Sequence, residues 1–219
     1  MSDSKNDIHP ADALKALDQV LTVDQRNDHV ELEDWHARID EIKLNGSTPI
    51  AVKQLFENAK NICLYSYFAY RLHQPAEAVA YSALEQALKL KYEEEKENLT
   101  LKQKPGSLAA LMDIALELGW ITDEGYISSR NLAASRVQMG LINKRIDEGV
   151  FREGDSYPVP EPTEEEIVAE MRSMDVAKKR LHAGRHVRNY LAHGDHGLSA
   201  SSIGMLANVA EEINQLFSG

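Results

Sequence analysis

The chain has 219 residues, of which 43% are hydrophobic, and a formal net charge of −11 at pH 7. This length and apolar content suit a globular protein with one domain, or with a core and a small extra lobe, and they argue against disorder. The acidic balance opposes a general, salt-driven affinity for nucleic acid, so any nucleic-acid contact is expected to be local.

Targeting signals and membrane spans are not expected. The first residues lack the basic, then apolar, then small-residue order of a secretory signal, and the uncharged run at residues 62–70 is too short to cross a bilayer. We therefore expect a cytoplasmic protein. The single cysteine, Cys63, excludes an intramolecular disulfide and a multi-cysteine zinc site, and its apolar, aromatic neighbours predict burial.

Almost every segment shows the three- and four-residue apolar spacing of helices, and strand-like alternation is scarce. An all-α fold is therefore predicted, either as one domain over residues 1–219 or as an N-terminal helical extension, 1–46, before a domain at 47–219. The predicted helices cover, in chain order, residues 10–21, 31–44, 49–72, 75–90, 108–118, 125–148, 163–193, and 199 or 201 to 217.

Capping residues predict where several of these helices begin and end. Residues 149–162, rich in glycine and proline, are interpreted as a loop. The other signals are left-handed glycine caps at Gly46 and Gly119, side-chain caps at Thr48 and Ser107, and a capping box at Thr163 with Glu166.

The late helix carries an unusual arginine. At 100° per residue, its apolar arc also contains Arg188. Residues 176–194 have a formal charge of +5 and no acidic residue, so a basic strip lies on one helix of an acidic protein. The arc is formed by Ala177, Leu181, Gly184, Val187 and Leu191.

An arginine on an inward arc needs a partner, because a guanidinium keeps its charge and its unpaired burial costs several kcal/mol. Three interpretations are open for Arg188: a structural ion pair with a carboxylate such as Glu85, a surface arginine that reaches solvent, and an anion-binding cleft. The opposite ridge of the helix consists of His182, His186, Asn189 and His193. Although histidines four residues apart can chelate a metal, the lysines and arginines around them would repel a cation, so no metal site is expected.

The sequence RNYLAH at residues 188–193 resembles the signature of HEPN domains, an arginine, a polar residue and a histidine after a short spacer. Residues 81–89, YSALEQALK, resemble the family's earlier core helix. The resemblance covers residues 50–217 loosely and implies an up-and-down helical bundle with additional N-terminal and inserted helices. The section at residues 120–162 is longer than a minimal four-helix bundle of this family needs.

The resemblance implies a metal-independent endoribonuclease that acts as a homodimer and needs no cofactor. Arg188 would hold the scissile phosphate, and His193 would act as general acid or base on the ribose 2′-hydroxyl or the leaving oxygen. Asn189 would orient that ring or bind a phosphate oxygen, and Glu85 would orient Arg188. RNA or a nucleotide would bind in a local basic cleft, with Arg185, His186 and His182 as further substrate-binding residues.

Residues five apart differ by about 140° around a helix, so Arg188 and His193 converge only if the helix end unwinds or two subunits share one site. The resemblance also implies roles in toxin–antitoxin pairs, with a cognate antitoxin protein as partner, or in phage defence. Two alternatives stay open: a non-catalytic HEPN-like module that binds nucleotide, RNA or protein, and a purely structural helical protein.

Overall fold

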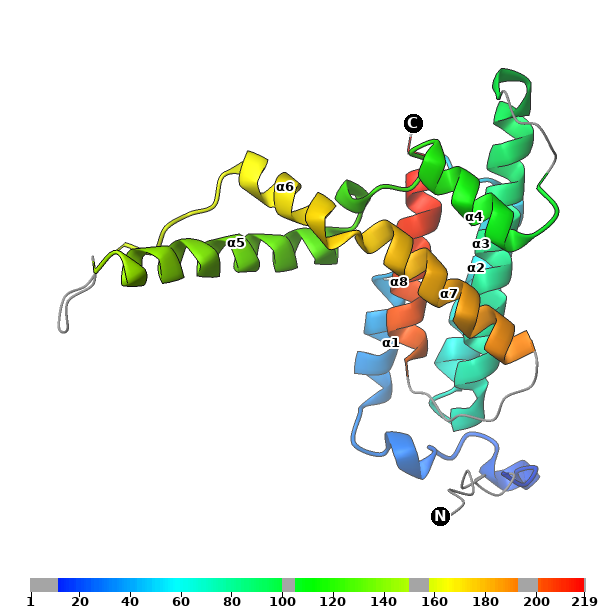
Figure 1. The fold of residues 1–219 in the computed structure, drawn as a ribbon. Helices are drawn as coiled ribbons and strands as arrows, with labels where there is room; N and C mark the ends of the chain where they lie inside the picture. Colours follow the sequence, from blue (N-terminus) through cyan, green and yellow to red (C-terminus); the bar gives the residue numbers. More distant parts are fainter. Residues whose placement is uncertain (1–11, 100–104, 150–157, 193–200, 219) are drawn as a thin grey trace, which may run out of the picture. The chain divides into compact units, whose positions relative to one another are not determined.

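The computed structural model describes residues 12–99, 105–149, 158–192 and 201–218, and these residues are helical with no strand among them (Figure 1). The predicted all-α class is thereby confirmed. Within these ranges no helix has both the length and the apolar content to cross a membrane. The α-helices are α1 (Leu32–Asp40), α2 (Ile50–Tyr65), α3 (His73–Glu95), α4 (Leu108–Glu117), α5 (Ile127–Asp147), α6 (Glu164–Met174), α7 (Val176–Ala192) and α8 (Ser202–Leu216).

The chain divides into two compact units, each built from two stretches of sequence. Unit 1 comprises residues 1–86 and 187–210, and unit 2 comprises residues 87–186 and 211–219. As a result α3, α7 and α8 each supply residues to both units. The domain boundary predicted after residue 46 stays a prediction.

The core of unit 1 forms where α1 packs on α2. Trp35 and Ile39 of α1 are buried four residues apart, which places them on one face of the helix. The indole of Trp35 donates a hydrogen bond to the carbonyl of Cys63, 3.2 Å away, which uses the polar end of the ring. Cys63 and Phe56 of α2 are fully buried, so the predicted burial of the cysteine is confirmed.

In unit 2, α6 packs along α5 (Figure 1). The contact is apolar, with Ala133 of α5 against Ile167 and Met171 of α6. Residues 158 and 160 lie beside α5, since Arg145 and Gln138 donate to their respective backbone carbonyls. The predicted capping box at the start of α6 is present: Glu166 N donates to the Thr163 hydroxyl, and Thr163 N donates to the Glu166 carboxylate.

The first predicted helix, residues 10–21, is wrong in its described part. Only the short 3-10 turn η1, Leu17–Gln19, forms there, and no side chain caps it. Leu14 and Leu17 are almost fully exposed, so these two leucines gain little packing from the described part of the chain. Short helices are marginal without such packing, which explains why the apolar spacing alone did not produce a helix.

The predicted helix over residues 163–193 is interrupted at Asp175, which has a left-handed backbone with φ of 52°. This residue ends α6, and α7 begins directly afterwards. The backbone N–H of Ala177 donates to the carboxylate of Asp123, 2.7 Å away, so a residue distant in sequence satisfies a free donor at the start of α7. Because that partner is 54 residues away, the local pattern did not signal the break.

Other helix boundaries also differ from prediction. α1 ends at Asp40, and Gly46 does not have the left-handed backbone expected of a cap. The Thr48 hydroxyl donates to the Asn45 side chain instead of capping α2, and the N-cap position is Pro49. The third predicted helix ends earlier than expected, at Tyr65.

Candidate functional site

The residue that raised the functional question, Arg188, lies on α7 within unit 1 and contacts Glu85 of α3. Its Nη2 atom is 3.3 Å from Glu85 Oε2. The side chain of Arg188 is 41% exposed and that of Glu85 is 22% exposed. The guanidinium is therefore reachable from solvent and is also paired with the carboxylate that the sequence suggested.

The Arg188–Glu85 pair is open to solvent and is not a sealed structural clasp. An ion pair with this much solvent access contributes about 0–1 kcal/mol to stability. A phosphate offers the same guanidinium planar, charge-assisted hydrogen bonds, which are stronger than those to neutral groups. An anion that arrives from solvent can contact Arg188 directly, because the pair with Glu85 leaves the side chain 41% exposed.

Three other candidate residues precede Arg188 on α7 and belong to unit 2. His182 and Arg185 line a shallow hollow together with α4 residues, among them Asp113 and the apolar side chains Met112 and Leu116. His186 is exposed. The structure thus places His182 and Arg185 beside each other on one surface and leaves His186 as a solvated residue.

The remaining candidates are not described in full. The backbone of Asn189 is in α7, but its side chain lies outside the described residues, and so does all of His193. Their predicted roles stay predictions. Within the described ranges, no three histidine, cysteine or carboxylate side chains are grouped as ligands for a metal ion.

A buried polar cluster in unit 1 was not predicted from the sequence. The imidazole Nδ1 of His73 is 2.6 Å from the Ser202 hydroxyl, which in turn lies 3.1 Å from the Cys63 thiol. All three residues are fully buried. Burial lowers the pKa of His73 and raises the pKa of the Cys63 thiol to about 11, so both groups are neutral at pH 7.

A hydroxyl bonded to an imidazole has the arrangement of an activated nucleophile. Here, however, neither Ser202 nor His73 can meet a substrate, because both are fully buried. The cluster is best explained as a polar part of the core that fixes the start of α8 against α2 and α3. It could not be found from the sequence, since His73 and Ser202 are 129 residues apart.

A buried carboxyl lies in unit 2, on α8. Glu212 is 4% exposed, and the hydroxyl of Tyr126 donates to its Oε1 over 3.4 Å. Arg180 lies over the Tyr126 ring but directs its Nη1 to Glu211, 2.8 Å away. Burial without a direct cationic partner raises the pKa of Glu212 to about 8.

Comparison of the chain with protein-family models, curated proteins and solved structures gives no match. What Arg188 and its neighbours do must therefore be inferred from their own geometry and from the motif that contains them.

Proposed function

We propose that this chain is a metal-independent endoribonuclease of HEPN type, with Arg188 as the phosphate-binding residue. The observation that carries the proposal is the state of this arginine, which is 41% exposed and held by Glu85 at 3.3 Å. A permanently charged side chain that is positioned yet open to solvent suits recognition of a phosphodiester. The sequence RNYLAH supplies the second chemical group, the imidazole of His193.

In the proposed reaction the ribose 2′-hydroxyl attacks the adjacent phosphorus and the bond to the 5′-oxygen breaks. His193 accepts the 2′-hydroxyl proton and then transfers it to the leaving 5′-oxygen, acting first as general base and then as general acid, since imidazole titrates near neutral pH. Arg188 binds the phosphate and stabilises the charge that grows on its oxygens. The products are a 2′,3′-cyclic phosphate and a 5′-hydroxyl end, and no metal takes part.

The rest of the proposed site follows from the motif. Asn189 would orient His193, and a homodimer would bring two copies of the motif to one cleft. Roles in toxin–antitoxin pairs or in defence, with an antitoxin as partner, belong to the same proposal. The net charge of −11 favours short RNA or a single loop over a long duplex, because distant phosphates would be repelled.

The test is cleavage of single-stranded RNA in EDTA by the unaltered chain and by Arg188→Ala and His193→Ala. We expect activity to fall by at least about 100-fold in each variant, with cyclic-phosphate ends among the wild-type products. Arg136→Ala is the matched control, because Arg136 forms an exposed ion pair with Glu170 at 3.2 Å in unit 2. Circular dichroism checks that each variant is folded.

A non-catalytic module that binds nucleotide or RNA is the second candidate, favoured by the fact that Glu85 already neutralises Arg188. It predicts no cleavage by the unaltered chain but RNA binding that weakens in Arg188→Ala. Cleavage that persists unchanged in Arg188→Ala and His193→Ala would refute the proposed site.

A further inference from the structure

Unit 2 contains a pocket of about 330 Å3 that is separate from the residues of the proposed nuclease site. Its walls come from α3, from the turn after α4 and from the end of α8. The lining residues are Lys91, Gly119, Trp120, Thr122, Gly125, Gln215, Leu216 and Ser218. Small-molecule sites span roughly 300–1,000 Å3, so this pocket suits a small organic ligand.

The turn after α4 places an indole in the wall of this pocket. Gly119 has a left-handed backbone with φ of 68°, and the backbone N–H of Trp120 donates to the carbonyl of Ala115 over 2.8 Å. This reversal of the chain buries Ile121 and leaves Trp120 partly exposed. A partly exposed indole offers a surface on which a planar ring can stack.

The same pocket is lined by Gln215 of α8, whose amide Nε2 is buried and has no hydrogen-bond acceptor among the residues that the structure describes. Its Oε1 accepts a hydrogen bond from the backbone N–H of Thr122 over 2.9 Å, which fixes the orientation of the amide. Gly125 packs against this amide, since a Cβ at that position would lie 2.0 Å from Gln215 Cδ. A buried donor without a partner is costly, so an acceptor bound in the pocket would stabilise the folded protein.

Lys91 of α3 supplies a positive charge at the pocket. Its ammonium lies 5.9 Å from the centroid of the Trp120 ring and 2.8 Å from Glu95 Oε1, and its side chain is 18% exposed. No carboxylate is among the described residues that line the pocket, although the chain has a net charge of −11. The lining therefore favours an anion over a cation.

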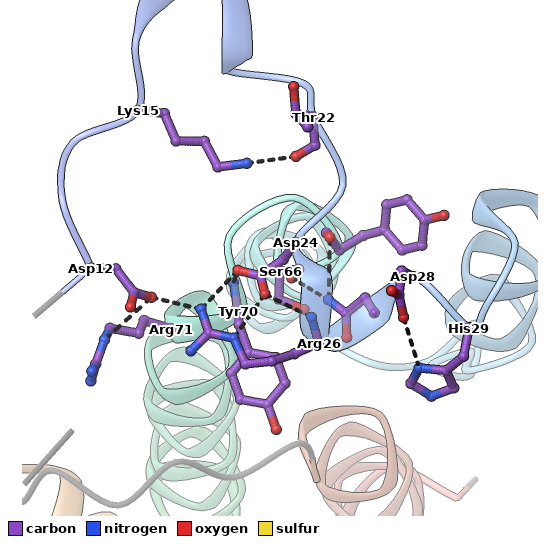
Figure 2. A network of polar contacts seen from close by, with 12 residues as sticks. Asp12, Lys15, Thr22, Asp24, Arg26, Asp28, His29, Ser66, Tyr70 and Arg71 are labelled. Carbon is purple, nitrogen blue, oxygen red and sulfur yellow. Dashed lines mark hydrogen bonds and ion pairs between the residues drawn. The ribbon is translucent and has the colours of Figure 1, made fainter. Parts of the chain in front are cut away.

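Unit 1 contains a comparable cation over a ring, in which the chain supplies the anions itself. The guanidinium of Arg26 lies 4.6 Å from the centroid of the Tyr70 ring. It bonds to Asp24 at 2.7 Å and to Asp12 at 2.8 Å (Figure 2). In unit 2, by contrast, no described residue supplies an acceptor to Gln215 Nε2.

We propose that the pocket of unit 2 binds a small aromatic carboxylate, with its ring against Trp120 and its carboxylate at Gln215 Nε2 and the Lys91 ammonium. A carboxylate provides the acceptor that the amide lacks and a charge opposite to that of Lys91. Its planar ring matches the indole. A bound water molecule is the competing explanation for the amide donor, and a ligand titration separates the two.

The test is a titration of isotope-labelled protein with benzoate, followed by NMR through the indole N–H signals of the two tryptophans. Trp35 is buried in unit 1 and donates to the Cys63 carbonyl, so its signal is the internal reference. We expect a saturable shift of the Trp120 signal while the Trp35 signal stays in place. Benzylammonium, which has the ring but the opposite charge, and cyclohexanecarboxylate, which has the charge but no planar ring, should each bind at least about fivefold more weakly.

Two substitutions test the assigned contacts. Gln215→Glu keeps Oε1 for the N–H of Thr122 and replaces the amide donor by an acceptor, so the affinity for benzoate should fall at least about tenfold. Lys91→Gln should lower it at least about fivefold. Lys144→Gln is the matched control, because Lys144 is an exposed lysine of unit 2 that also pairs with a glutamate four residues later but does not line the pocket. Circular dichroism checks that each variant is folded.

Three results would overturn the proposal. The first is the lack of a saturable Trp120 shift up to about 10 mM benzoate, which would leave water as the partner of Gln215. The second is an equal response to benzylammonium, and the third is an affinity for benzoate that is unchanged in Gln215→Glu and Lys91→Gln. Neither Arg188 nor His193 takes part in these measurements, so their outcome is independent of the RNA-cleavage test.

Discussion

Glu212 makes the stability of the protein depend on pH in a direction opposite to that of an ordinary surface carboxylate. It is buried on α8 beside Tyr126, while the nearby Arg180 bonds to Glu211 instead. Burial raises the pKa of Glu212 to about 8. The folded state thus keeps a proton that the unfolded chain, with a carboxyl pKa of about 4.3, has already released.

The size of the effect follows from linkage. Between the unfolded and the folded pKa, unfolding releases one proton, so the free energy of unfolding falls by about 1.4 kcal/mol for each pH unit of increase. Stabilisation by the bound proton is complete below the unfolded pKa and is lost as pH rises through the folded pKa of Glu212. From pH 5 to pH 7.5 the predicted loss is about 3 kcal/mol, a large part of a domain's stability.

Glu212→Gln removes the titration and keeps the shape and the hydrogen-bond acceptor for Tyr126. Urea unfolding followed by circular dichroism at pH 5, 6, 7 and 7.5 should show the variant gaining about 3 kcal/mol relative to wild type across this range. Glu211→Gln is the control; its carboxylate is a partly exposed neighbour paired with Arg180, and it should not gain stability in this way. If the difference in unfolding free energy between wild type and Glu212→Gln were independent of pH, the assigned protonation of Glu212 would be refuted.

Two further predictions concern contacts that position loops. Gly125→Ala should destabilise the fold by about 1–3 kcal/mol, because an added Cβ would lie 2.0 Å from the Gln215 side chain, whose Oε1 accepts a hydrogen bond from a backbone N–H; an unchanged urea midpoint would contradict this. Asp24→Asn should cost about 2 kcal/mol at pH 7, since Arg26 holds the pKa of Asp24 well below its usual range. That cost should shrink as pH falls below about 4 and the wild-type carboxyl is protonated in the unfolded chain, which thermal melts at pH 3 and pH 7 can measure.

Local chemistry explains which parts of the fold could be predicted from the sequence. The Ser107 side chain caps α4 by accepting from the N–H of Ala110, and Gly119 has the expected left-handed backbone with φ of 68°. The Thr163–Glu166 capping box is equally local. In each case the partners lie within three residues or one turn, so the residue types alone determine the geometry.

The breaks that were missed depend on partners distant in sequence. The start of α7 is set by Asp123, and the segment before α1 is held by Asp24 and Arg26 on the corner after α2. Apolar spacing gives the same signal in a helix that packs and in one that does not. Residues 10–21 were therefore predicted as a helix although Leu14 and Leu17 are almost fully exposed among the residues that the structure describes.

The candidate site was predicted from one residue, Arg188, because it is a charged side chain on an otherwise apolar arc of its helix. Arg188 stands on an apolar arc, and the cost of burying an unpaired guanidinium left three interpretations open: an ion pair, a side chain that reaches solvent and an anion-binding cleft. The structure shows both a pair with Glu85 at 3.3 Å and a side chain that is 41% exposed. The presence of the Arg188–Glu85 pair does not discriminate between a structural ion pair and a phosphate site, because both interpretations need it. Its exposure bears on the choice, since an ion pair this open to solvent contributes only about 0–1 kcal/mol to stability. Loss of a phosphate contact in a transition state costs several times more, so an activity loss in Arg188→Ala without a matching loss of stability is the signature of the anion site.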